Sequence, residues 1–142
     1  MCFIGDGNNM ANSLIVGGLK VGMNVAVATP DGYKPDGAVL EFTKGYGDKF
    51  ALETDPFMAA SGADILITDT WTSMGEEAEK EERKKIFKDY QINRQLLAAA
   101  NAGAMVQHCL SAYRGQEITE EVFEEHADEI FNEAENRLHA QK

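Results

Sequence analysis

Short apolar runs alternate along the chain with longer segments in which apolar residues recur at helical spacing. The short runs are typical of buried strands, and the alternation of strands with helices predicts a parallel sheet covered by helices on both faces. We therefore expect an α/β fold with three layers, α/β/α, and a Rossmann-like sheet of five parallel strands in the order 3-2-1-4-5. The segments predicted as strands are 2–4, 24–28, 50–53, 64–68 and 104–107.

The segments between these strands predict helices. Gly22 supplies a stop after the first helix, Pro56 suits a helix start, and Thr119 caps the last helix, which continues in pieces to the end. The helix 76–88 is highly charged, and its acidic residues mostly precede its basic ones, so we expect a solvated face there. The expected helices are 8–20, a short one within 37–48 that Gly45 and Gly47 end, then 56–61, 76–88, 93–102 and the final one from Thr119.

Length and composition narrow the class of protein. A chain of 142 residues has the common size of one domain. Its net charge of -11 argues against a nucleic-acid partner, because the phosphate backbone would repel it. We find no apolar run long enough to span a membrane and no signal peptide, and the two cysteines form no disulfide framework. We therefore expect a cytoplasmic protein without a membrane partner.

The polar residues that follow the strands indicate where a ligand would bind. Ligands of open parallel sheets bind outside the carboxyl ends of the strands, close to the point where the strand order reverses. We expect the side chains after the first, fourth and fifth strands to converge there. These residues are Asp6, Asn8 and Asn9, then Asp69, Thr70, Trp71, Thr72, Ser73 and Met74, and finally His108, Cys109 and Leu110.

Three other kinds of site are less well supported. Gly5-Asp6-Gly7 begins like a dinucleotide-binding fingerprint, but Met10 stands where the third glycine belongs. His108 next to Cys109 suggests a nucleophilic thiolate, although neighbouring strand residues point to opposite faces, and such a pair is more often structural. Three histidines without ligand spacing predict no metal site.

Four segments resemble ornithine carbamoyltransferases in order and spacing, and the resemblance covers essentially the whole chain. The Ser73-Met74 pair marks the branch of the family that uses ornithine. The segments are Gly5-Asp6-Gly7-Asn8-Asn9-Met10-Ala11-Asn12-Ser13, Asp69-Thr70-Trp71-Thr72-Ser73-Met74-Gly75, His108-Cys109-Leu110 and Glu135-Asn136-Arg137-Leu138-His139-Ala140-Gln141-Lys142.

This resemblance implies a set of substrate-binding residues. Asn9, Ser73 and Met74 would hold the amino-acid end of L-ornithine. With them, Asp69 would pair with the α-ammonium through a charge-assisted hydrogen bond.

The resemblance also implies residues near the reacting atoms. Cys109 and the Leu110 carbonyl would lie beside the δ-amine and the carbamoyl group, and Arg137 would help to hold carbamoyl phosphate. The candidate catalytic residues are Asp69, His108, Cys109 and Arg137. The implied reaction needs no cofactor: the neutral δ-amine attacks the carbamoyl carbon, expels phosphate and gives citrulline.

In this family an N-terminal domain with a Ser-Thr-Arg-Thr-type loop holds most of the carbamoyl phosphate, and the family chain continues past Lys142. We find no such loop in this sequence. We therefore expect residues 1–142 to be the ornithine-binding domain alone, inactive by itself, and a monomer or a weak non-native dimer. The alternative is a non-enzymatic isolated or engineered fragment used to study folding.

One residue departs from the family pattern. The family reads His-Cys-Leu-Pro with a cis bond before proline, whereas Ser111 stands here. A cis bond costs about 0.5–1 kcal/mol before proline and roughly 2.5–4 kcal/mol before other residues. We therefore expect a trans bond between Leu110 and Ser111 and a displaced loop.

Overall fold

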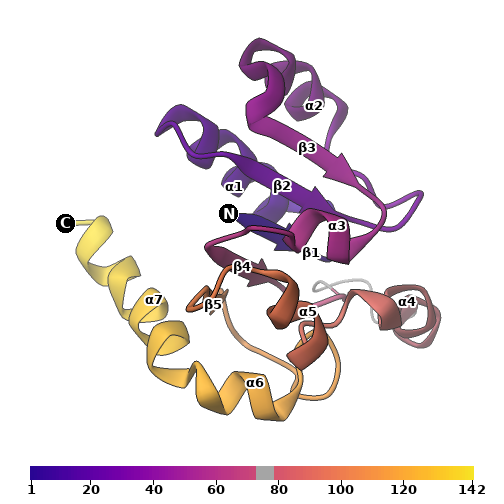
Figure 1. Cartoon of the computed structure of the whole chain (residues 1–142), viewed down its shortest axis with the longest axis vertical. Helices are drawn as coiled ribbons and strands as arrows, with labels where there is room; N and C mark the ends of the chain where they lie inside the picture. The colour runs from indigo at the N-terminus through magenta and orange to yellow at the C-terminus, as the bar shows by residue number, and fades with distance from the viewer. Residues whose placement is uncertain (73–78) are drawn as a thin grey trace.

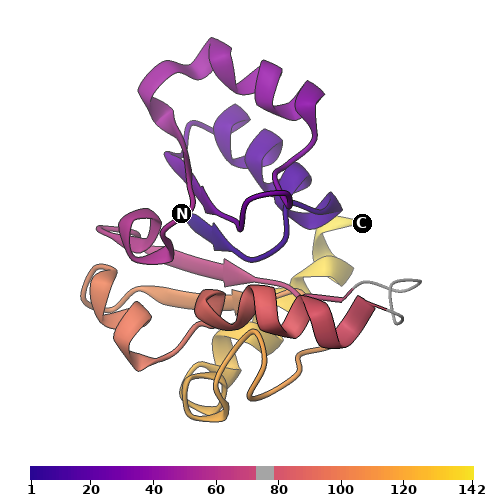
Figure 2. The same ribbon diagram turned by 90° about the vertical axis from the view of Figure 1, so that its right-hand side faces the viewer.

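A computed structural model describes residues 1–72 and 79–142 of the chain. Its five strands form one parallel sheet in the order β3-β2-β1-β4-β5, with β1 in the middle, so the predicted topology is confirmed (Figure 1). In Figure 2 the first three strands, with the indigo-to-purple helices, lie above β4 and β5. The strands are β1 Cys2–Ile4, β2 Val25–Ala28, β3 Phe50–Glu53, β4 Ile65–Thr68 and β5 Met105–His108.

The helices follow the expected pattern, and several begin at a side chain that accepts a backbone N–H. Asn8, Asn93 and Thr119 cap α1, α5 and α6 in this way, which satisfies donors that a helix start leaves free. Residues 76–78 of the expected helix 76–88 lie outside the described part. The helices are α1 Asn9–Lys20, α2 Gly37–Thr43, η1 Lys44–Lys49, α3 Pro56–Ala60, α4 Lys80–Phe87, η3 Lys88–Tyr90, α5 Arg94–Ala99, α6 Glu120–Glu125 and α7 Ala127–Ala140.

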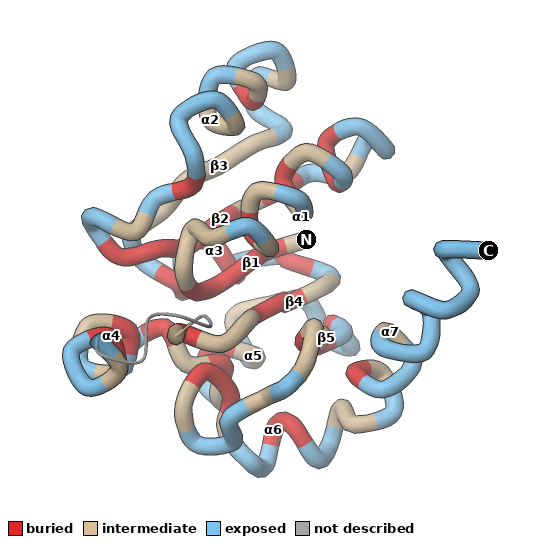
Figure 3. The backbone as a smooth tube through the Cα atoms, turned by 180° about the vertical axis from the view of Figure 1, so that it is seen from behind, coloured by how far each residue is buried: buried red, intermediate tan, exposed pale blue. Residues whose placement is uncertain are grey.

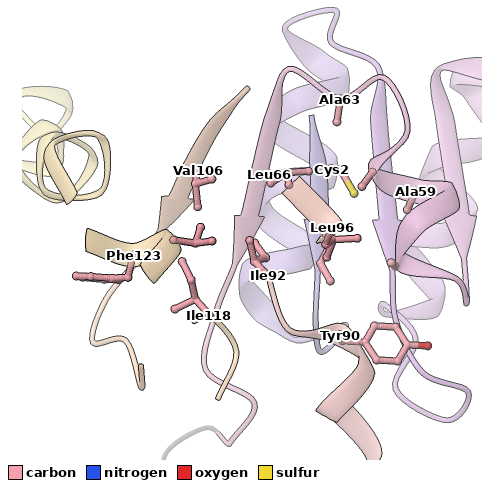
Figure 4. Packing of buried hydrophobic residues seen from close by; sticks show 14 of the residues in the cluster. Cys2, Ala59, Ala63, Leu66, Tyr90, Ile92, Leu96, Val106, Ile118 and Phe123 are labelled. Atoms are coloured by element: carbon pink, nitrogen blue, oxygen red, sulfur yellow. The ribbon is translucent and has the colours of Figure 1, made fainter. Parts of the chain in front are cut away.

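Each face of the sheet carries its own hydrophobic core. Successive strand residues point to opposite faces, so Cys2 and Ile4 belong to one core and Phe3 to the other. The first core packs against α3, α5 and Phe87, as Figure 4 shows in part. The second core packs against α1 and α2. Burial on both faces explains why the strands are continuous apolar runs, and it gives the expected three layers.

The expectation of a wholly solvated face on the charged helix is wrong for α4. Arg83 is only 4% exposed, and its guanidinium lies over the rings of Tyr33 and Phe87. It forms an ion pair with Asp6, and its Nε donates to the Trp71 carbonyl. A guanidinium can be buried here because it stacks on aromatic rings while its donors bind partners in a plane.

The C-terminal helix α7 lies along β5, at the edge of the sheet (Figure 1). Glu129 accepts a hydrogen bond from the Val106 backbone N–H at 2.8 Å, and Ile130 is fully buried. Beyond this anchor the helix is mostly exposed (Figure 3), including Phe131 at 53% and Leu138 at 59%. Among the helices that the structure describes, none is long and apolar enough to cross a bilayer.

Candidate functional site

A cleft lies at the carboxyl ends of β1, β4 and β5, where the sequence predicted that polar groups would converge. Its volume is about 480 Å³, within the usual range for small-molecule sites. The strand order reverses between β1 and β4, so this is also the expected crevice of an open parallel sheet. The cleft is lined by Asn9, Asp69, Thr70, Thr72, Leu110, Ser111 and Tyr113.

The carboxylate of Asp69 is held by three donors from three parts of the chain. Its Oδ1 accepts from the Thr70 backbone N–H at 2.7 Å and from the Cys109 thiol at 3.0 Å. Its Oδ2 accepts from the Asn8 side-chain amide at 3.2 Å. A carboxylate has about four acceptor positions, so this arrangement leaves room on Oδ2 for a further donor.

Cys109 acts in this arrangement as a hydrogen-bond donor. Burial raises the pKa of the Cys109 thiol well above its ordinary value, and the hydrogen bond to Asp69 and the charges of Asp69 and Glu133 raise it further. A thiol of this kind stays protonated at neutral pH, and the thiolate is the nucleophilic form. The geometry therefore does not support a nucleophilic cysteine.

His108 lies directly below this site and is fully buried with Glu117. Its Nδ1 accepts from the Leu110 backbone N–H at 2.9 Å, so Nε2 carries the proton and donates to Glu117 Oε1 at 2.9 Å. The same oxygen accepts from the Tyr113 backbone N–H at 2.6 Å. Glu117 was not predicted, because a glutamate in a polar turn gives no sign of burial.

The fold brings together three side chains of types that can bind a metal ion, although their spacing in the sequence predicted no metal site. One ligand atom each from Asp69, His108 and Cys109 lies within 4.8 Å of the others. Both ring nitrogens of His108 already have hydrogen-bond partners, however, and the Cys109 thiol donates to Asp69. A metal ion would have to displace these internal bonds, so the group is better described as a hydrogen-bonded network.

The bond between Leu110 and Ser111 is cis, so the expected trans bond is wrong. Hydrogen bonds hold the loop on both sides of this bond, through the Leu110 and Tyr113 N–H groups described above. Leu110 and Ser111 both line the cleft, as the resemblance implied for Leu110.

The other predicted site residues are placed differently. Asn9 is exposed and lines the cleft, whereas Ser73 and Met74 lie outside the described residues. Arg137 lies on the exposed half of α7. In the part of the chain that the structure describes, no hydrogen bond or ion pair joins Arg137 to the network around Asp69.

The second glycine of Gly5-Asp6-Gly7 has a packing role. A Cβ at Gly7 would lie 2.3 Å from the backbone atoms Lys34 C and Pro35 N, a distance that real Cβ atoms do not reach. The Gly7 N–H also donates to the Tyr33 carbonyl at 2.8 Å. Close approach of this segment accounts for Gly7, so this glycine needs no bound dinucleotide to explain it.

Glu133 is a further acid near the site that sequence reasoning missed. Burial raises the pKa of Glu133, and the negative charge of Asp69 raises it too, while His108 acts in the opposite direction. Glu133 Oε2 is buried and has no hydrogen-bond partner in the described part. These interactions place Glu133 of α7 close to Asp69 and His108.

Comparison with known proteins identifies the family. The sequence model of the family described as "Aspartate/ornithine carbamoyltransferase, Asp/Orn binding domain" matches residues 1–142. The chain is 54% identical to the ornithine carbamoyltransferase of Gloeobacter violaceus, over 100% of this chain and 47% of that protein. It thus spans about half the length of such relatives.

Solved structures give the same result. The anabolic ornithine carbamoyltransferase of Campylobacter jejuni is similar with a TM-score of 0.91 and 45% identity, over 96% of this chain and 46% of that one. The ornithine carbamoyltransferase of Pyrococcus furiosus has a TM-score of 0.87 and 45% identity, over 99% of this chain and 46% of its own. The chain therefore belongs to the aspartate/ornithine carbamoyltransferase family and corresponds to its Asp/Orn binding domain.

Proposed function

We propose that this chain binds L-ornithine in the cleft beside Asp69 and supplies the ornithine half of a carbamoyltransferase site. The observation that carries the proposal is the Asp69 carboxylate, which three donors hold at the cleft while Oδ2 keeps acceptor capacity. An α-ammonium fits such an acceptor, because a charge-assisted hydrogen bond is stronger than a neutral one. Relatives named as ornithine carbamoyltransferases support the same substrate.

In the proposed reaction the amino-acid end of ornithine is fixed by Asp69 and Asn9, together with Ser73 and Met74. The δ-amine then lies near the Leu110 carbonyl and the Cys109 thiol. Its neutral nitrogen forms a bond to the carbamoyl carbon, the bond from that carbon to the phosphate oxygen breaks, and the nitrogen loses a proton. The products are citrulline and phosphate.

The chain's contribution to catalysis is the placement of the nucleophile. Holding two reactants in line can lower a barrier by about 7–11 kcal/mol, but only when both are held. The protonated Cys109 thiol is a neutral donor, and the His108–Glu117 pair fixes the loop that carries the Leu110 carbonyl. We propose that carbamoyl phosphate is held mostly by a separate N-terminal domain, with help from Arg137.

A chimera tests this function. The part of the Gloeobacter violaceus enzyme that this chain does not match would be joined to residues 1–142, and citrulline formation from carbamoyl phosphate and L-ornithine would be measured. We expect turnover with ornithine, little with L-aspartate, and strong loss in a D69A chimera. A well-folded chimera that prefers L-aspartate, or one that ignores D69A, would contradict the proposed function.

A further inference from the structure

The orientation of the Asn8 side chain is fixed by the start of helix α1. Its Oδ1 accepts from the backbone N–H groups of Met10 at 3.0 Å and Ala11 at 3.2 Å. The amide oxygen is therefore committed to the helix, and the NH₂ group must point the other way. It points at Asp69, and Nδ2 lies 3.2 Å from Oδ2.

The support behind Asn8 is rigid. Helix α1 packs on the sheet through the fully buried residues Ala11 and Ile15. The end of β4 is fastened to β1 as well, because Thr68 Oγ1 donates to the Ile4 carbonyl at 2.8 Å. The bond from Asn8 to Asp69 thus joins two loops that lie 61 residues apart on a well-packed frame.

Among the three donors to Asp69 that the structure describes, Asn8 is the most distant in the sequence. Thr70 is the next residue in the chain and would move with Asp69. Cys109, like Thr70, donates to Oδ1 and does not contact Oδ2. Only the bond from Asn8 restrains Oδ2 among the contacts described here, and Oδ2 is the oxygen with acceptor capacity left.

From this geometry we infer that Asn8 is a positioning residue: through its amide it holds Asp69 Oδ2 in the direction that receives the substrate ammonium. This inference rests on the proposed function for its substrate, but the position of Asp69 can be tested without any substrate. Asn8 has a structural role as a helix cap too, so a test must separate the two roles.

Asn8→Ser separates them, because serine caps a helix about as well as asparagine but lacks the amide donor. The readout is the rate at which iodoacetamide alkylates Cys109, whose thiol is restrained by Asp69. Cys2 is fully buried, and burial raises its pKa to about 12, so it stays unreactive. Asn93→Ser is the matched control, since Asn93 caps α5 and has no contact with Asp69 in the described structure.

We expect N8S to speed alkylation at Cys109 by about threefold or more, towards the rate of D69N, because a less restrained Asp69 holds the thiol less firmly. N93S should react like the unchanged chain, and melting temperatures should show that both variants are folded. Asn8→Thr, which also keeps a cap, replaces N8S if that variant is poorly folded.

A second arm uses L-ornithine and follows its affinity by NMR titration. We expect N8S to weaken binding roughly tenfold, equivalent to about 1.4 kcal/mol, while N93S leaves it unchanged. Alkylation and affinity in N8S that both equal those of N93S would overturn the inference and leave Asn8 as a helix cap only. Faster alkylation in N8S, in a chain that binds no ornithine, would support the positioning role and count against the proposed function.

Discussion

Two parts of this molecule carry predicted site residues, and they are built differently. Around Asp69, hydrogen bonds join the segments that follow β1, β4 and β5. The next residue after Cys109, Leu110, is bonded to His108, which is paired with the buried Glu117. On the C-terminal half of α7, Arg137 and Leu138 are exposed. Under the proposed function, residues 1–142 would organise the ornithine side by themselves, whereas the side that holds carbamoyl phosphate would lie on another domain.

The largest expected effect follows from the proposal that carbamoyl phosphate is held mostly by another domain. The 142-residue chain alone should form no citrulline above background from ornithine and carbamoyl phosphate, because placing only one reactant forfeits most of the roughly 7–11 kcal/mol that joint placement supplies. A sensitive colorimetric or radiochemical citrulline assay checks this, with the chimera as positive control. Turnover by the purified chain, abolished by D69A, would show that α7 and the cleft suffice.

The second prediction concerns the stability of the network below Asp69. Glu117→Ala removes the acceptor for His108 Nε2 and for the Tyr113 N–H, and a buried donor without a partner costs about 1–3 kcal/mol. The free energy of unfolding, measured with urea, should fall by at least that amount. Glu135→Ala on the exposed part of α7 is the control and should change it by less than about 0.5 kcal/mol. Equal losses of unfolding free energy in the two variants would contradict the difference between the network near Asp69 and the exposed part of α7.

Much of the fold was predictable because it depends on local pattern. The bounds of β1 and the strand order were predicted correctly, since buried parallel strands are short apolar runs and crossover rules restrict their order. The convergence of Asn8, Asp69 and Cys109 at one edge follows from the same topology.

Other features depend on contacts between distant residues, and the sequence could not indicate them. Arg83 looks like one more charge on a polar helix, yet Tyr33 and Asp6 from other segments bury and pair it. The spacing of Arg83 and Phe87, four apart on one helical face, was the available signal. The buried Glu117 gave no local signal, and before Ser111 the usual preference of a non-proline residue predicted trans where the structure has cis.

The third prediction addresses the exposed side of α7. The chain should be a monomer or a weak dimer at micromolar concentration, because apolar side chains such as Phe131 and Leu138 tend to find partners when exposed. Phe131→Glu together with Leu138→Glu should remove any self-association seen by sedimentation velocity, and the urea midpoint checks that the variant is still folded. A tight trimer that survives these substitutions would place the contact elsewhere.

The fourth prediction has the smallest expected effect and concerns Glu133, the residue of α7 that lies near the network around Asp69. Because its pKa in the folded chain is raised above the ordinary 4.5, folding holds this proton more firmly. Its stabilising effect is complete below pH 4.5 and is lost as the pH rises through the folded pKa. Glu133→Gln imitates the protonated form, so stability should fall less with rising pH in this variant.

Urea unfolding of the Glu133→Gln variant at several pH values above 4 measures how its stability depends on pH. The exposed Glu135→Gln variant is the control. Identical pH profiles for the unchanged chain and both variants would show that Glu133 is not held near Asp69 and His108 as the structure has it.

The most direct test of the central claim is an NMR titration of the ¹⁵N-labelled chain with L-ornithine. Backbone amides that border the cleft, at Asn9, Thr70 and Leu110, should shift and saturate. Asp69→Ala should abolish these shifts while the rest of the spectrum stays folded, and L-aspartate should not produce them in the unchanged chain. Saturable shifts that persist in the D69A variant, or an absence of shifts at these three amides, would contradict the claim that this chain alone builds the ornithine-binding side of the site.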